Sequence, residues 1–174
     1  MSIQFLTHAG RWVNPFNFTE ADIDIETIAN AHANQCRNGG HPDCDQFYSV
    51  SENTVALRLV VPPHLARVAL LHDAAEAYIG DLIRPIKDRM PDFVRLDEEI
   101  TEIILGYYNV DPGLMSELRP YDIAICVDEM EQLFGLVDPA LGQFEPLGVK
   151  LDCWSPHEAR ADFLDRFEEL FSDE

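Results

Sequence analysis

One stretch of the sequence constrains the fold more than any other: residues 70–87, which read LLHDAAEAYIGDLIRPIK. Residues 66–78 contain neither glycine nor proline and are rich in alanine and leucine, so they are predicted to form a helix. The chain should leave this helix at Gly80 and Asp81, and Pro85 prevents an easy restart. We expect the rest of the chain to be arranged around this apolar helix.

The predicted helix carries three ionisable side chains in an otherwise apolar segment. His72 and Glu76 are four residues apart and share one face, and Asp73 lies about 100° further round. A buried charge is costly unless it is paired or binds a metal. A metal ion could take the imidazole of His72 and the carboxylate of Asp73, leaving Glu76 to handle water. The simpler alternative is a chance His-Asp pair, because a buried histidine is more often hydrogen-bonded than metal-bound.

The whole stretch resembles the central helix of the HD-domain metal-dependent phosphohydrolases, in which this His-Asp pair supplies the second and third metal ligands. It is most similar to a subgroup of small bacterial 5'-deoxynucleotidase-like proteins. That subgroup continues with a glutamate three residues after the Asp, then Gly-Asp, a Pro and a Lys. The matching residues are Asp73, Glu76, Gly80, Asp81, Pro85 and Lys87.

A second segment resembles the part of the same subgroup that carries the first metal ligand. There an Arg is followed by Gly-His, by Tyr-Ser-Val and then by a ligand histidine; here Arg37, His41 and residues 48–50 match, but Asn53 stands where the histidine is expected. An amide oxygen is a poorer ligand for a transition metal than an imidazole. Three explanations stay open: Asn53 binds the metal weakly or through water, His41 supplies the imidazole from its glycine-containing loop, or the site has lost its metal and become a binding pocket.

The resemblance also implies residues that contact the substrate. Arg37 would contact phosphate, for which a planar guanidinium is well suited, and Lys87 would help to offset the charge on the phosphoryl oxygens. Asp81 would lie on the side of the sugar hydroxyl. Asn38 stands where the subgroup often has an aromatic residue near the sugar, which leaves the sugar preference open.

The last metal ligand of the family is an Asp in a later helix, followed seven residues on by a Glu and then by a Leu. Asp122, Glu129 and Leu133 fit this spacing. Seven residues make two helical turns, so Asp122 and Glu129 share a face. Asp128 is an alternative ligand, and an Asp at a helix start can instead be a simple cap.

The remaining pattern predicts an all-α fold of about six helices. Apolar residues recur at steps of three and four in several segments, and Ser, Asp or Pro stands at their starts. The other expected helices are residues 24–36 with Asp22 or Asp24 as cap, residues 52–61 with Ser51 as cap, and residues 92–108. A short turn at 114–118 and a restart at Pro120 should precede a helix at 121–135. The final helix should begin at Ser155 and Pro156 and pack on the core or on a partner subunit. Residues 4–7 are expected to form a short strand, and residues 12–18 and 138–154 to form loops.

Length and charge limit the class of protein. The chain has 174 residues and a formal net charge of −20, with only 12 Lys and Arg. We expect one domain, residues 1–174. A nucleic-acid polymer is an improbable partner for so acidic a chain, whereas a mononucleotide needs only a few local cations. There is no signal-peptide pattern and no apolar run long enough to span a bilayer.

The cysteines do not suggest a disulfide framework, because none of the four forms a CxxC pair. A cytoplasmic location is therefore expected. A structural zinc built from Cys36, His41 and Cys44 would lack a fourth ligand.

Together these features predict a metal-dependent phosphohydrolase that acts on nucleotides, with deoxynucleotides as the implied class. It would remove either a 5'-monophosphate or the triphosphate of a dNTP, and a homo-oligomer is expected. The metal would be Co, Mn, Zn or Mg, held by His72, Asp73 and Asp122, with His41 or Asn53 as the remaining candidate. Glu76, Asp81 and Arg37 are the expected catalytic residues. The alternative is a non-catalytic nucleotide-binding relative, which Asn53 motivates.

Overall fold

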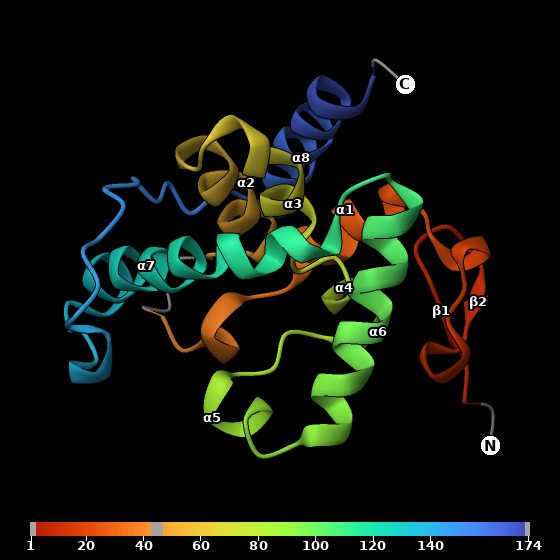
Figure 1. Ribbon diagram of the computed structural model, residues 1–174, viewed down its shortest axis with the longest axis horizontal. Helices are drawn as coiled ribbons and strands as arrows, with labels where there is room; N and C mark the ends of the chain where they lie inside the picture. The colour runs from red at the N-terminus through yellow and green to blue at the C-terminus, as the bar shows by residue number, and fades with distance from the viewer. Residues whose placement is uncertain (1–2, 43–46, 173–174) are drawn as a thin grey trace.

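The computed structural model describes residues 3–42 and 47–172 and confirms the all-α prediction. The elements, shown in Figure 1, are β1 Phe5–Leu6, β2 Trp12–Val13, α1 Ile25–Asn34, α2 Val50–Val60, α3 Ala66–Leu71, α4 Glu76–Ile79, α5 Arg84–Lys87, α6 Pro91–Tyr107, α7 Met115–Phe134 and α8 Pro156–Phe171. Short 3-10 turns lie at Pro15–Asn17, Glu20–Asp22, Arg37–Gly40, Pro63–Leu65, Pro112–Leu114 and Pro139–Leu141. Among the described residues, no helix is long and apolar enough to cross a membrane.

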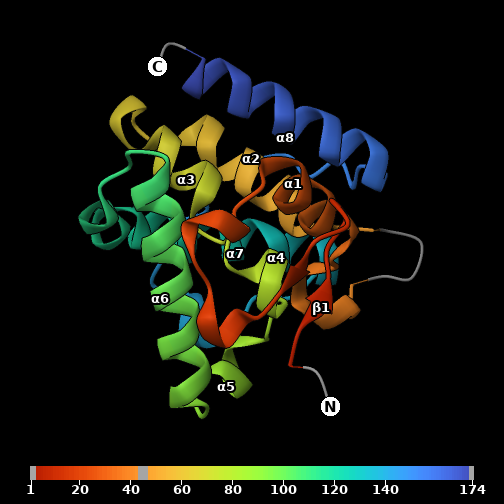
Figure 2. The same ribbon diagram turned by 90° about the vertical axis from the view of Figure 1, so that its right-hand side faces the viewer.

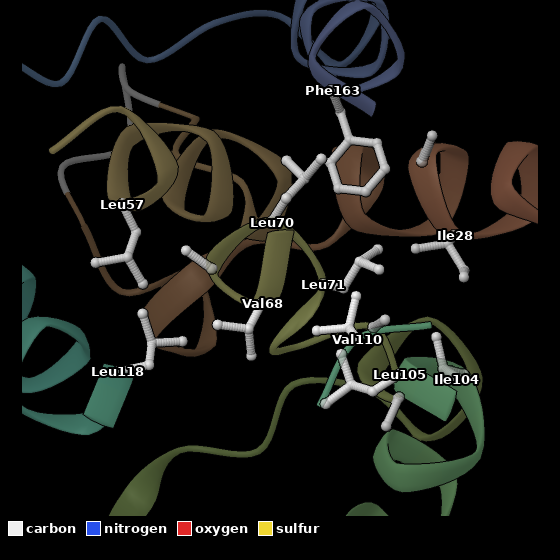
Figure 3. Packing of buried hydrophobic residues seen from close by; sticks show 14 of the residues in the cluster. Ile28, Leu57, Val68, Leu70, Leu71, Ile104, Leu105, Val110, Leu118 and Phe163 are labelled. Atoms are coloured by element: carbon white, nitrogen blue, oxygen red, sulfur yellow. The ribbon is translucent and has the colours of Figure 1, made fainter. Parts of the chain in front are cut away.

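The core is formed where α3 is surrounded by other helices. α1 packs on α8 and α2 packs on α3, while α6 and α7 also contact α3. Figure 2 shows α8 lying across α1, α2 and α3. Side chains from these helices meet in one cluster, and Figure 3 shows Leu70 of α3 beside Phe163 of α8, with Leu71 of α3 near Val110. Because every residue of α3 except Arg67 is buried, this segment is the centre of the fold, as predicted.

Local capping follows the sequence closely at two of the helices. The carboxylate of Asp24 accepts a hydrogen bond from the amide of Thr27 at 2.8 Å and caps α1. Ser155 and Glu158 form a reciprocal capping box at the start of α8. At α2 the prediction was two residues late, since Ser49 is the cap and the Ser51 hydroxyl instead donates to the carbonyl of Ala159 at 2.9 Å.

The N-terminal segment forms a hairpin in which Phe5 pairs with Val13 and Leu6 with Trp12. The short strand predicted at residues 4–7 is therefore present, but Trp12–Val13 is a strand where a loop was expected. The hairpin lies beside α6, away from α7 (Figure 1).

The predicted central helix is interrupted where its charged residues begin. α3 ends at Leu71, residues 72–75 form a tight turn, and α4 resumes at Glu76. We call residues 72–75 the HD turn. Two side chains near the end of α1 contact carbonyl oxygens at and just after this turn: His32 contacts that of Asp73 at 3.0 Å, and Gln35 donates to that of Glu76 in α4 at 2.9 Å. The backbone bonds of the turn itself run over three residues instead of four, from the Glu76 amide to the Asp73 carbonyl at 2.8 Å and from the Ala77 amide to the Ala74 carbonyl at 3.3 Å.

α7 is longer than predicted because it continues through Pro120. Proline removes one backbone donor, and the carbonyl of Ser116 consequently has no helical partner at this turn. Ser116 is exposed, so water can take that carbonyl at little cost. Asp122 therefore lies inside a helix of 20 residues and is not its cap.

The loop before α8 is fastened by two buried carboxylates. Glu52 accepts three hydrogen bonds of 2.8–2.9 Å from the amides of residues 152–154. Asp128, the alternative metal ligand, accepts from the amides of Leu147 and Gly148 at 2.7 and 2.9 Å. These contacts give Glu52 and Asp128 structural roles in anchoring the loop.

Candidate functional site

A cleft of about 420 Å³ opens between α5, α6 and α7. The HD turn contributes His72 and Asp73 to its lining, and α7 contributes Asp122. Its cations are Arg84 and Lys87 of α5 and Arg119 of α7, and its acids on α6 are Asp97, Glu98 and Glu102. A volume of several hundred Å³ is typical of sites for small molecules.

His72 is buried and lies at the centre of a cluster with two partly exposed carboxylates. Its Nδ1 atom lies 2.9 Å from the carbonyl oxygen of Ala69. Its Nε2 atom lies 3.2 Å from Oδ2 of Asp73 and 3.5 Å from Oδ1 of Asp122. The structure thus places side by side the three residues expected to bind metal, although Asp122 is 49 residues further along the chain than Asp73.

The two carboxylates control the protonation of this imidazole. Burial lowers the pKa of His72, but Asp73 and Asp122 together outweigh it and raise the pKa well above 6.5. Burial raises the pKa of both carboxyl groups, yet the neighbouring His72 makes the net shift of each downward. The cluster without a metal is therefore stabilised as an imidazolium between two carboxylates.

Arg37 approaches the same cluster from the 3-10 turn Arg37–Gly40. Its Nη1 atom lies 3.3 Å from Oδ2 of Asp73, and its Nε atom lies 3.7 Å from Oε1 of Glu129. Only 13% of its side chain is exposed. Arg37 contacts Asp73 from the side away from the cleft and does not itself line the cleft. In this conformation it acts on the cleft only by its contact with Asp73.

Asn53 and His41, the two candidates for a fourth ligand, are placed very differently. Asn53 is fully buried on α2, and its amide donates to Oε1 of Glu129 at 2.6 Å, while its own Oδ1 has no hydrogen-bond partner among the described residues. His41 is exposed. Cys36 is exposed as well, and Cys44 lies outside the described residues, so the structural-zinc alternative stays untested.

Glu76 lies next to the cluster and contacts Lys87 rather than His72. Lys87 Nζ is 2.6 Å from Oδ2 of Asp97 and 3.8 Å from Oε1 of Glu76. Burial and the charge of Asp73 raise the pKa of Glu76 well above 4.5, which favours its protonated form. Asp81 is half-buried just after α4, and burial raises its pKa too.

Glu129 is the residue of this region that sequence reasoning left without a role. It is only 1% exposed. Its Oε1 atom accepts a hydrogen bond from the Asn53 amide, and its Oε2 atom accepts one of 3.3 Å from the Asn38 amide. Its seven-residue spacing from Asp122 was the available signal. That spacing shows that Glu129 lies on the same helix face as Asp122. It does not show that Arg37, Asn38 and Asn53 contact Glu129.

The donor set of His72, Asp73 and Asp122 fits a divalent cation chemically. One imidazole and two carboxylates suit Zn, Mn and Co. The Nε2 atom of His72 is buried without a hydrogen-bond partner among the described residues, and its Nδ1 faces a carbonyl, as is usual for a metal-bound histidine. The two Nε2–carboxylate distances of 3.2 and 3.5 Å are close to the separation of neighbouring ligands on one ion, about 3.0–3.4 Å. In their present conformations, however, no group of three or more His, Cys, Asp or Glu among the described residues forms a ready metal site.

Fold and site together define an all-α protein with a buried imidazole–carboxylate cluster beside a cleft. No protein-family model matches the chain. It is 31% identical to the uncharacterized protein YfdR of Escherichia coli strain K12, over 94% of this chain and 93% of YfdR. It is also 30% identical to an uncharacterized protein of Rhodobacter capsulatus, over 91% of this chain and 90% of that protein. The chain therefore belongs to the same family as YfdR.

Proposed function

We propose that the protein is a metal-dependent phosphohydrolase of the HD-domain type that acts on nucleotides, with deoxynucleotides as the substrate class. The observation that carries the proposal is the convergence of His72 and Asp73 of the HD turn with Asp122 of α7 at one cleft. A buried structural ion pair would not need to lie at a cleft that also presents arginines.

The cations of the cleft support an anionic substrate. Arg84 and Arg119 are exposed and form no ion pair with any described residue, although acids outnumber bases in the chain by 32 to 12. In so acidic a protein, two unpaired guanidinium groups in one cleft are available to bind phosphate oxygens.

The side chains around the cluster have distinct tasks in this reaction. Held by His72, Asp73 and Asp122, a divalent cation would lower the pKa of a water molecule and polarise a phosphoryl oxygen. Glu76, whose pKa is raised by burial and by Asp73, can hold a proton for the leaving oxygen. Lys87 Nζ lies 3.8 Å from Oε1 of Glu76, and the resemblance assigns Asp81 to the sugar hydroxyl.

The test is phosphate release from a panel of dNMPs and dNTPs with Mn²⁺, Co²⁺, Zn²⁺ or Mg²⁺, together with metal analysis of the purified protein. The panel also separates release of a monophosphate from release of a triphosphate. Asp73→Ala and Asp122→Ala should lose both metal binding and activity, whereas Asp88→Ala, which changes an exposed carboxylate just after α5, should keep both. Activity that survives Asp73→Ala would rule out this site.

A second candidate is a nucleotide-binding relative without catalysis. It is favoured by Asn53, because its amide is directed at Glu129 where the family has a ligand histidine. This protein would bind nucleotides in calorimetry and release no phosphate with any of the four metals.

We also propose a cytoplasmic homo-oligomer. Cys36, Cys126 and Cys153 are free thiols, as expected in a reducing compartment. The hairpin region exposes Trp12 and Phe16 by 62% and 74%, and association would remove such apolar surface from water. Light scattering coupled to size exclusion gives the mass directly, and a monomer at micromolar concentration would contradict the proposal.

A further inference from the structure

The carboxylate of Glu129 is the meeting point of three segments that are remote in sequence. It lies on α7, where its carboxylate accepts hydrogen bonds from Asn38 of the 3-10 turn and Asn53 of α2 and forms an ion pair with Arg37 of the same turn. Both carboxylate oxygens are engaged, and the side chain does not line the cleft. Glu129 therefore has no access to a substrate, and any influence on the reaction must pass through its partners.

One of these partners leads directly to the proposed metal ligands. The guanidinium of Arg37 faces Glu129 through Nε at 3.7 Å and Asp73 through Nη1 at 3.3 Å. Asp73 contacts His72, and His72 contacts Asp122. Asp122 and Glu129 both belong to α7 and lie two turns apart. The chain of contacts from Glu129 to Asp122 therefore begins and ends on the same helix.

The second partner fixes the turn that carries Arg37. Asn38 has a φ of 55°, a left-handed conformation that costs free energy for a residue with a side chain, and Gly39 and Gly40 also have positive φ. The Asn38 amide donates to Oε2 of Glu129 at 3.3 Å. Glu129 thereby holds both the charge of Arg37 and the backbone turn that aims it.

The third partner is Asn53, which stands where the family has its first ligand histidine. Asn53 donates to Glu129 at 2.6 Å, a short hydrogen bond to a buried acceptor. This contact occupies the amide end of the side chain and orients it towards Glu129. Asn53 thus supports the same carboxylate as Asn38 does.

We propose that Glu129 is a positioning residue of the phosphohydrolase site, which holds Arg37 against Asp73 and so sets the geometry of the ligand cluster, with Asn53 as part of this support. The inference rests on the proposed function and adds to it a buried layer behind the ligands. Outer partners of metal ligands of this kind commonly change metal affinity or activity 10–100-fold when they are mutated.

The experiment is a double-mutant cycle of Glu129→Gln and Arg37→Gln, with Glu131→Gln as the matched control, since Glu131 is an exposed carboxylate on the same helix. The readouts are the dissociation constant for Mn²⁺ by calorimetry, kcat and KM for phosphate release, and thermal unfolding of each variant. Glu129→Gln should weaken Mn²⁺ binding or lower kcat/KM about 10–100-fold. In the Arg37→Gln background the same change should cost less than about threefold, because coupled residues are not additive. The control should stay within about twofold of the wild type.

Each other outcome has a defined meaning. Equal losses from Glu129→Gln in both backgrounds would show that it does not act through Arg37, and a change in thermal stability alone would leave it a merely structural residue; either result overturns the proposal. If Glu129→Gln does not fold, Glu129→Asp keeps the charge with a shorter side chain and enters the same cycle. A wild type that neither binds Mn²⁺ nor releases phosphate overturns the proposed function, and the role of Glu129 with it. An active wild type with an additive cycle overturns the role of Glu129 alone.

Discussion

Replacing His32 by glutamine should remove one defined part of the protein's sensitivity to acid. His32 is completely buried on α1, where its ring packs edge-on against Phe163 with centroids 5.8 Å apart. Its Nε2 atom contacts the carbonyl oxygen of Asp73 at 3.0 Å. Burial lowers its pKa from 6.5 to about 4, so the ring stays neutral in the folded protein. Glutamine can donate to the same carbonyl and does not titrate.

The size and sign of the effect follow from this pKa. Below pH 6.5 the unfolded chain takes up a proton on His32 that the folded protein accepts only near pH 4, so acid favours unfolding. The stability due to neutral His32 is complete above pH 6.5 and falls as the pH drops towards 4. The expected loss is about 2 kcal/mol at pH 5 and about 3 kcal/mol at pH 4, because each pKa unit corresponds to about 1.4 kcal/mol.

Urea denaturation of both proteins at pH 7.5, 5 and 4 provides the assay. Buried carboxyl groups with raised pKa, such as Glu52 and Asp97, act in the opposite direction, but they are present in both proteins and cancel in the difference. The variant starts less stable at pH 7.5 if its packing is poorer, and the gap between the two proteins should shrink or reverse by about 2 kcal/mol at pH 5. A gap that stays constant with pH would refute the reasoning.

Three further predictions, with Leu136→Ala as a surface control, concern the packing and capping that hold the site in place. Glu52→Ala removes the acceptor of three backbone hydrogen bonds and should cost about 3 kcal/mol, a fall of about 8 °C in Tm by circular dichroism. Phe163→Ala should cost about 3–5 kcal/mol in urea denaturation, because the ring is fully buried. Leu136→Ala, at a side chain 73% exposed, should change stability by less than about 0.5 kcal/mol. Ser155→Ala removes the cap of α8 and should lower Tm by about 3 °C, and an unchanged Tm would contradict the capping box.

Signals confined to a few neighbouring residues carried over well from sequence to structure. Asp24 and Ser155 cap their helices as expected, because a cap depends only on residues within one turn. The apolar character of residues 66–71 likewise identified the segment that is buried from all sides. The motif spacing correctly suggested that Asp122 should be sought near the HD turn, and the two lie in contact.

Features that depend on distant partners could not be read from the sequence. The helix is interrupted at the HD turn, where His32 and Gln35 contact the carbonyl groups of Asp73 and Glu76, each 41 residues further along the chain. Residues 72–75 have no helix-breaking composition of their own. The spacing from Asp122 placed Glu129 on a helix face but predicted none of its partners, because only the fold brings Asn38 and Asn53 to it.

The continuity of α7 through Pro120 has a consequence for how this chain tolerates changes in length. Asp122 and Glu129 reach their partners because they have the same rotational phase on one rigid rod. A single residue inserted between them would turn one carboxylate by about 100° relative to the other. No rotation of the whole rod could then restore both contacts, whereas an insertion in the loop beyond Gly135 would leave both undisturbed.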